Sequence, residues 1–356
     1  MPAMPERSRR KVWPLALVLG LGLLPGPLFA QPPAGHYPYF PPDSPWTRDV
    51  SAAAVDPESP AVIAWLASVG GWGGGAMQID FTIEVLEADA GTPFRSFTPT
   101  EDFYDPDCDF QPVPVPAGGA IEGEDGYECE SNGDCHLLVV HRPSGKLYEM
   151  WRADIVGPQF FGGCLAVWDL SLTYPEVGRG DQCTSADAAG FPIAPLLFSA
   201  DEVAAGEVAH ALRFILPNSR IRDSIYVRPS THSTGPTSGP AGAPPYGTRL
   251  RLRANYPLGS LPNAAARTVA RAMQKYGILL ADGGTIALTA QSDRFTTAKW
   301  SGLLGPHDLE ALQVTDFEMI DAGPRFLYTG DCERVDPIFT DGFELGDLSK
   351  WGLVVE

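Results

Sequence analysis

The stretch CHLLVVHRPSGKLYEMWRA, residues 135–153, contains two runs rich in aliphatic and aromatic residues on either side of a Pro-Ser-Gly turn. Proline presets φ for a turn and glycine accepts a positive φ, so the stretch predicts a β-hairpin. In its second strand, period-two alternation places Leu147, Glu149 and Trp151 on one face. The carboxylate of Glu149 is therefore expected on a face that is otherwise apolar.

Similar short runs along the rest of the chain read as further strands, whereas only one segment reads as a convincing helix. Pro262 and Asn263 open this helix, residues 264–276 form it, and Gly277 is a candidate cap at its end. We therefore predict a mainly β fold, a β-sandwich of jelly-roll or concanavalin-like type with one or two helices. The further strands are expected in residues 77–86, 165–172, 210–216, 225–228 and 248–256, with a hairpin in 278–290 that turns at Asp282-Gly283.

The strand TRLRLRANY alternates cleanly and carries Arg249, Arg251 and Arg253 on one face. Such a pattern is typical of a half-buried strand. The arginines are then expected either on a solvated face or in a local basic patch.

The first 30 residues resemble a Sec signal peptide, with a positive start, an apolar run and a Pro/Gly break before Ala30. The apolar run is too short for a good membrane span, and no later segment approaches about 18 apolar residues. We expect an exported chain without a membrane span, located outside a Gram-negative cell, in its periplasm or on its surface. The predicted parts are a signal peptide (1–30), a Pro/aromatic-rich lead-in (31–42), the β-sandwich-type domain (43–329) and a tail (330–356).

Without residues 1–30, the chain has 21 basic and 43 acidic residues, a net charge of −22. Such a charge repels phosphate backbones and other polyanions, so nucleic acid is a poor partner and a neutral ligand fits better.

Six cysteines all follow residue 30. An even number in an exported chain favours disulfides, and the absence of paired C-x-x-C spacings argues against zinc. Cys129 with Cys135, and Cys164 with Cys183, are plausible pairs among the 15 connectivities that six cysteines permit. Residues 98–134 are expected to form a long loop tied by cystines. Asp105, Asp107 and Asp109 alternate as in calcium loops, but the glycine and bidentate glutamate of an EF-hand are missing, so we predict no metal and no cofactor.

Several segments resemble a family of secreted bacterial proteins that often occur beside carbohydrate-binding modules and have no assigned mechanism. The segments are residues 43–59, 136–153, 185–214, 275–284 and 314–321, so the resemblance spans nearly the whole chain before the tail. It implies work on a polysaccharide by association only. The tail resembles a pattern of secreted proteobacterial proteins, F-x-D-G-F-E-x-G-D-x-S-x-W, beginning at Phe339 and ending at Trp351. This pattern implies contact with the envelope or the secretion machinery.

These features favour a secreted glycoside hydrolase that uses paired carboxylates on a polysaccharide or oligosaccharide. Glu149 is the first candidate, because burial raises the pKa of a carboxyl group towards that of a general acid. Asp187, in the loop QCTSADAAGFPIAP (182–195), and Glu202 are its candidate partners. His232 lies in a polar loop, where a functional imidazole is easier to reach, whereas His210 reads as a core histidine. The predicted substrate-binding residues are Trp151, Tyr148, Arg213 and Ser185.

Two alternatives stay open. The chain can be a non-catalytic carbohydrate-binding or envelope protein, in which case Trp72, Trp151 and Trp168 are expected to line a shallow platform. It can also be a metal-free polysaccharide lyase with a His–Tyr–Arg set. For the loop 182–195, the alternative to chemistry is that Ser185 and Asp187 bond to nearby backbone groups and hold a turn.

Overall fold

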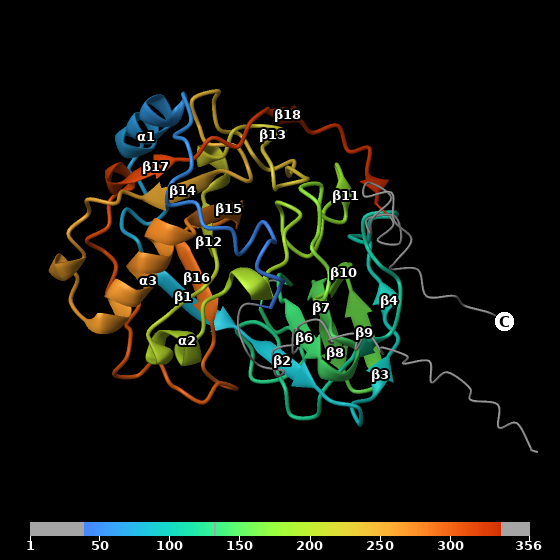
Figure 1. Cartoon of the computed structure of the whole chain (residues 1–356). Helices are drawn as coiled ribbons and strands as arrows, with labels where there is room; N and C mark the ends of the chain where they lie inside the picture. Colours follow the sequence, from blue (N-terminus) through green and yellow to red (C-terminus); the bar gives the residue numbers. More distant parts are fainter. Residues whose placement is uncertain (1–38, 132, 336–356) are drawn as a thin grey trace, which may run out of the picture. The chain divides into compact units, whose positions relative to one another are not determined.

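The computed structural model describes residues 39–131 and 133–335, and strands predominate over helices in this part (Figure 1). The prediction of a mainly β fold with few helices is confirmed. Three α-helices are present in the described residues, which exceeds the one or two helices predicted. They are α1 (Ser59–Ser68), α2 (Ala200–Ala205) and α3 (Ala264–Lys275).

Helix α3 is the predicted one. The Asn263 side chain accepts a hydrogen bond from the Ala266 N–H at 2.7 Å, which satisfies one of the free donors of the first turn. Gly277 follows at φ +73°, where a Cβ would lie 2.9 Å from the Leu250 carbonyl oxygen. Helix α2 has only six residues, too few for a helical period to appear in the sequence.

The larger sheet has six strands and mixes parallel with antiparallel pairs. Its central strands β12 and β15 are parallel, and β14 pairs antiparallel with both β15 and β17. In sheet order the strands are β1 (Ile79–Ile83), β16 (Leu288–Gln291), β12 (Leu212–Leu216), β15 (Ile278–Gly283), β14 (Arg249–Leu252) and β17 (Phe317–Met319).

The expected hairpin over residues 278–290 is wrong. Its two halves are the strands β15 and β16, but β12 lies between them and pairs with both. The Asp282-Gly283 dipeptide ends β15 instead of forming a two-residue turn. Local periodicity identified both strands, whereas their partner comes from a segment more than 60 residues earlier in the chain.

The smaller sheet has four strands and contains the predicted hairpin of residues 135–153, which is confirmed. Strands β6 and β7 pair antiparallel from Leu137 with Met150 to His141 with Lys146. The alternation in β7 is also as expected, since Leu147 belongs to one core cluster while Tyr148 and Met150 belong to another. The order is β10 (Cys164–Asp169), β7 (Lys146–Trp151), β6 (Leu137–His141) and β2 (Val85–Ala88).

Only Glu84 separates β1 of the larger sheet from β2 of the smaller one (Figure 1). The chain therefore passes from one sheet to the other within a single extended segment. The remaining strands are short: β3 (Phe94–Arg95), β4 (Thr98–Pro99), β5 (Val113–Pro114), β8 (Asp154–Val156), β9 (Gln159–Gly162), β11 (Gly180–Asp181), β13 (Ile225–Tyr226), β18 (Phe326–Leu327) and β19 (Glu333–Arg334).

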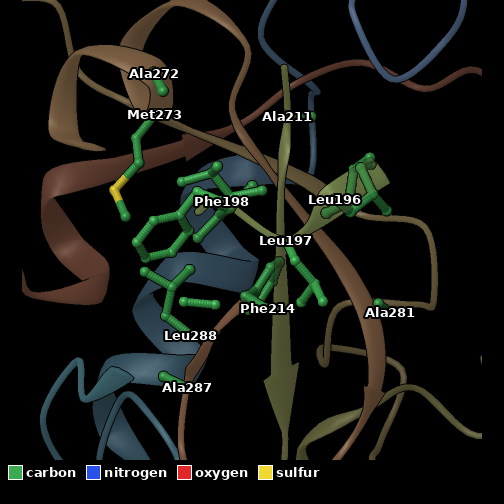
Figure 2. Close-up of a cluster of buried hydrophobic side chains, with 14 of the residues drawn as sticks. Leu196, Leu197, Phe198, Ala211, Phe214, Ala272, Met273, Ala281, Ala287 and Leu288 are labelled. Carbon is green, nitrogen blue, oxygen red and sulfur yellow. The ribbon is translucent and has the colours of Figure 1, made fainter. Parts of the chain in front are cut away.

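The main core cluster takes side chains from both sheets and from the helices. Figure 2 shows Phe198, Phe214 and Leu288 packed together with Met273 of α3 on one side. Phe40, which falls within the predicted lead-in, also belongs to this core and is 3% exposed. Apolar burial on this scale is the main favourable contribution to folding.

Arg249 and Arg251 of β14 lie on a covered face, which corrects the expectation of a solvated or basic face for these two, whereas Arg253, just after the strand, keeps 45% of its side chain exposed. Arg249 and Arg251 are each 8% exposed. Arg251 donates to the carbonyl oxygens of Val50, Ser51 and Ala53 and forms an ion pair with Glu318. The chain around residues 45–53 thus supplies acceptors that a strand pattern cannot reveal.

Three disulfides are formed, and one of the two expected pairs is correct. Cys129 pairs with Cys135 as expected. Cys164 pairs with Cys108, and Cys183 pairs with Cys332, so the pair Cys164–Cys183 is wrong. The disulfides Cys108–Cys164 and Cys129–Cys135 tie the long irregular segment 98–134, as predicted. Disulfides of this kind fit an exported protein.

The predicted signal peptide and the Phe339–Trp351 pattern lie outside the described residues. The described start of the tail is attached to the domain, because β19 pairs with β11 and Cys332 is bonded to Cys183. Among the residues that the structure describes, no helix has the length and apolar character needed to cross a bilayer.

Candidate functional site

The loop 182–195 joins the two sheets through its polar groups. Its backbone donates to Glu149 of β7 in the smaller sheet, and its Asp187 pairs with Arg213 of β12 in the larger sheet. Phe191 and Ile193 are fully buried in the main core. The loop therefore has a fixed conformation and links the two sheets.

Glu149 is fully buried and surrounded by hydrogen-bond donors. Its carboxylate accepts from the Ile193 N–H at 2.9 Å, the Ala194 N–H at 2.8 Å and the Trp168 indole N–H at 3.0 Å. These donors favour the charged form, but burial outweighs them and raises the pKa of Glu149 to about 7. Such a pKa suits a general acid, whereas zero exposure keeps a polysaccharide away from this carboxylate.

Asp187 and Arg213 form a buried ion pair at 2.8 Å, which brings together two of the predicted site residues. Arg213 also donates to Asp282 at 2.9 Å, and Asp282 keeps 29% of its side chain exposed. Burial raises the pKa of Asp187 to about 7 although the guanidinium opposes this, and the Asp187 charge in turn raises the pKa of Glu149. Burial also raises the pKa of Asp282.

His136 is a second cation, after Arg213, that contacts the loop 182–195. One ring nitrogen lies 2.6 Å from a Glu122 carboxylate oxygen and the other 3.1 Å from the Ala186 carbonyl oxygen. Because both neighbours only accept, both nitrogens carry protons and the ring is a cation. Burial alone would lower the pKa of His136, but Glu122 raises it to about 9.

We call the residues Glu122, Asp134, His136, Asp187, Arg213 and Asp282 the seam cluster, because their charges interact with one another. Its inner part consists of buried cations and Asp187. Its outer part contains carboxylates that reach solvent, with Glu122 at 23% and Asp282 at 29% side-chain exposure. Trp151, which is half-buried, donates its indole N–H to the exposed Asp134.

Glu202 and Ser185 serve local structure. Glu202 forms a capping box with Ser199 at the start of α2, and its other oxygen lies 3.1 Å from a His210 ring nitrogen. Ser185 donates to the Phe191 carbonyl oxygen at 2.6 Å and accepts from the Asp187 N–H at 3.0 Å. The side-chain-to-backbone turn described for this loop is thus present, and neither residue belongs to the seam cluster.

His232 contacts the backbone of the loop 182–195 and Tyr328. Its Nδ1 donates to the Ala188 carbonyl oxygen at 2.7 Å, so Nε2 is free to accept from the Tyr328 hydroxyl at 2.8 Å. Burial lowers the pKa of His232, which keeps the ring neutral. Asp107 interacts with both residues, so the surroundings of this pair are negative.

The aromatic side chains are divided between several places. Tyr148 projects from the opposite face of β7 into the second core cluster, so it does not lie with Glu149 and Trp151. Trp72 and Trp168 are 1% and 0% exposed, which contradicts a shared platform of Trp72, Trp151 and Trp168. Trp151 alone of these three keeps an accessible surface.

Within residues 39–131 and 133–335, two groups of residues have the spacing of metal ligands, Asp107 with Cys183 and Cys332, and Glu124 with Cys129 and Cys135. All four cysteines are in disulfides and supply no thiolate, so neither group suits a thiolate-bound metal.

Sequence reasoning missed Glu122, His136, Asp282 and Tyr328. His136 begins the predicted hairpin directly after Cys135, and Asp282 was assigned to a turn. His136 and Asp282 lie at the ends of buried strands, whereas Glu122 lies in an irregular segment and Tyr328 follows the part-exposed strand β18, so the four residues share no local sign. No protein-family model matches the chain, and comparison with curated proteins and with solved structures also finds no match.

The raised pKa values predict that the protein is more stable in mild acid than in base. Glu149 keeps its proton to about pH 7 when folded, against 4.5 ordinarily, so its contribution to stability is lost as pH rises between these values. The contribution of His136 is complete below pH 6.5 and is lost as pH rises towards 9. His232 acts in the opposite direction below pH 6.5. We expect a melting temperature roughly 5 °C higher at about pH 5.5 than at about pH 9. A higher value at the basic pH would contradict this.

Proposed function

We propose that the chain is a secreted glycoside hydrolase that acts on a polysaccharide at the outer part of the seam cluster. The observation that supports this most is a pair of part-exposed carboxylates, Asp282 and Glu122, each held by a buried cation. Two carboxylates in different surroundings are what acid–base cleavage of a glycosidic bond requires.

In this proposal Asp282 is the general acid. Burial raises its pKa, and the Arg213 contact fixes its position. Glu122, oriented by His136, is the nucleophile or the base. Glu149 and Asp187, the carboxylates favoured from sequence, then support the reaction by holding the loop and Arg213 in place.

Trp151 is the proposed substrate contact. An indole ring offers a flat apolar surface on which the C–H face of a sugar ring packs, while its N–H is already used by Asp134. The negative charge of the seam cluster and of the whole chain favours a neutral polysaccharide.

The second candidate is a carbohydrate-binding or envelope protein without catalysis. It is favoured by the complete burial of Glu149 and the 1% exposure of Asp187. A lyase for uronic acids is less favoured, because Asp107 beside His232 and Tyr328 repels a substrate carboxylate.

Three finer points belong to the same proposal. The larger and the smaller sheet are candidates for the layers of a β-sandwich of jelly-roll or concanavalin-like type, because both line one core cluster. Three of their strand pairs are nevertheless parallel. We also propose export from a Gram-negative cell, with the C-terminal tail contacting the envelope or secretion machinery.

Incubation of the mature chain with a panel of neutral and uronic polysaccharides tests the function. We expect new reducing ends from at least one neutral polysaccharide without absorbance from unsaturated products. Unsaturated products would support the lyase, and binding without any product would support the non-catalytic alternative.

A further inference from the structure

A surface depression of about 520 Å³ lies beside β1 and the start of α3. Its chemically distinctive lining residues are Phe81, Trp300, Asn263 and Asp308. None of them belongs to the seam cluster, and the seam chemistry proposed above does not use them. The depression combines aromatic surface with a carboxylate and an amide.

The two aromatic rings have different roles. Trp300 is 7% exposed and fixed, because its indole N–H donates to the Gln291 carbonyl oxygen at 2.8 Å and its ring packs against Phe198. Phe81 lies with its ring centroid 4.7 Å from that of Trp300 and stays half-buried. Trp300 therefore supports Phe81, and Phe81 offers a ring surface to a ligand.

Asp308 is held rigidly while keeping one oxygen available. Its Oδ2 accepts from the Asn263 amide at 2.7 Å and from the Gly305 N–H at 2.8 Å. Its Oδ1 has no hydrogen-bond partner in the part of the chain that the structure describes. Asn263 is fixed in turn, because its own Oδ1 caps α3. A preorganised carboxylate oxygen is a good acceptor for a ligand hydroxyl.

We propose that this depression binds one unit of a neutral saccharide, with a sugar ring packed on Phe81 and a ring hydroxyl donating to Asp308. The choice of saccharide rests on the proposed function, while the polar and aromatic arrangement is independent of it. Anionic sugars are excluded by the Asp308 charge and by the net charge of −22 without residues 1–30. By binding one part of a polysaccharide, this second site would raise the effective concentration of the rest of the chain at the seam cluster.

Isothermal titration of the mature chain with cellohexaose, xylohexaose, laminarihexaose, mannohexaose and chitohexaose tests this site. We expect at least one to bind, and Phe81→Ala to weaken that binding by about tenfold. Asp308→Asn keeps an acceptor for Asn263 and Gly305 but removes the charge, and it should weaken binding by roughly threefold or more. Phe110→Ala, at an exposed phenylalanine outside the depression, is the matched control and should leave binding unchanged.

Failure of all five saccharides to bind would overturn the inference, and so would binding unaffected by both variants. Repeating the titration with Asp282→Asn measures binding without hydrolysis. Phe81-dependent binding in a parent chain that releases no reducing ends would uphold this site and reject the hydrolase. Release of reducing ends together with Phe81-independent binding would have the opposite meaning.

Discussion

Replacing Cys183 and Cys332 together by serine is expected to lower the free energy of unfolding by about 5 kcal/mol. The two cysteines are 149 residues apart, so their bond restricts a large part of the unfolded chain. In the folded chain it joins the start of the loop 182–195 to the segment beside β19. Loss of the bond therefore frees the unfolded state and releases one end of this loop.

The matched control is the double replacement of Cys129 and Cys135, which are 6 residues apart. Closing so short a loop restricts the unfolded chain less, and we expect a loss of about 2 kcal/mol. Urea unfolding of both variants and the parent chain gives the two values. Equal losses, or a larger loss in the control, would show that loop length does not govern the contribution of these disulfides.

At about pH 8, above the Glu149 pKa of about 7, Glu149→Gln is expected to lower the free energy of unfolding by about 3 kcal/mol. The carboxylate accepts from three N–H groups, two of the backbone and one of Trp168. A glutamine of the same shape replaces one accepting oxygen by a donating NH₂ group, which then faces an N–H. In a site without exposure to solvent, water cannot relieve this conflict.

Glu87→Gln is the control for this variant, because Glu87 lies on β2 of the same sheet with 59% of its side chain exposed. Its loss should stay within about 0.5 kcal/mol. Thermal and urea unfolding of the two variants measure the difference. If Glu149→Gln is no more harmful than Glu87→Gln, the hydrogen bonds around Glu149 do not hold the loop 182–195.

Features that depend on neighbours in the chain could be predicted from the sequence. The hairpin of residues 135–153 and helix α3 have complete local signals, namely alternation around a Pro-Ser-Gly turn and an Asn263 cap. The partner of a strand is a different matter, since β12 separates β15 from β16 without any local mark. The pair Cys183–Cys332 also has no local mark, because the two cysteines are 149 residues apart.

The candidate site could also be predicted from the sequence only in part. Glu149 stood out because a carboxylate interrupts an apolar face, and its burial agrees with that position. The structural role of Glu149 could not be predicted, because its two backbone donors come from residues 44 and 45 positions later. Asp282 lies 69 residues from Arg213, so its role depends on a contact that only the folded chain makes.

The central claim is that Asp282 takes part in chemistry while Asp187 holds the structure. The most direct measurement is the initial rate of reducing-end release per folded molecule for Asp282→Asn, beside Asp187→Asn, on the polysaccharide that the parent chain cleaves. We predict that Asp282→Asn loses at least about a hundredfold in rate with a nearly unchanged melting temperature, whereas Asp187→Asn mainly loses melting temperature. A parent rate retained by folded Asp282→Asn would contradict the account.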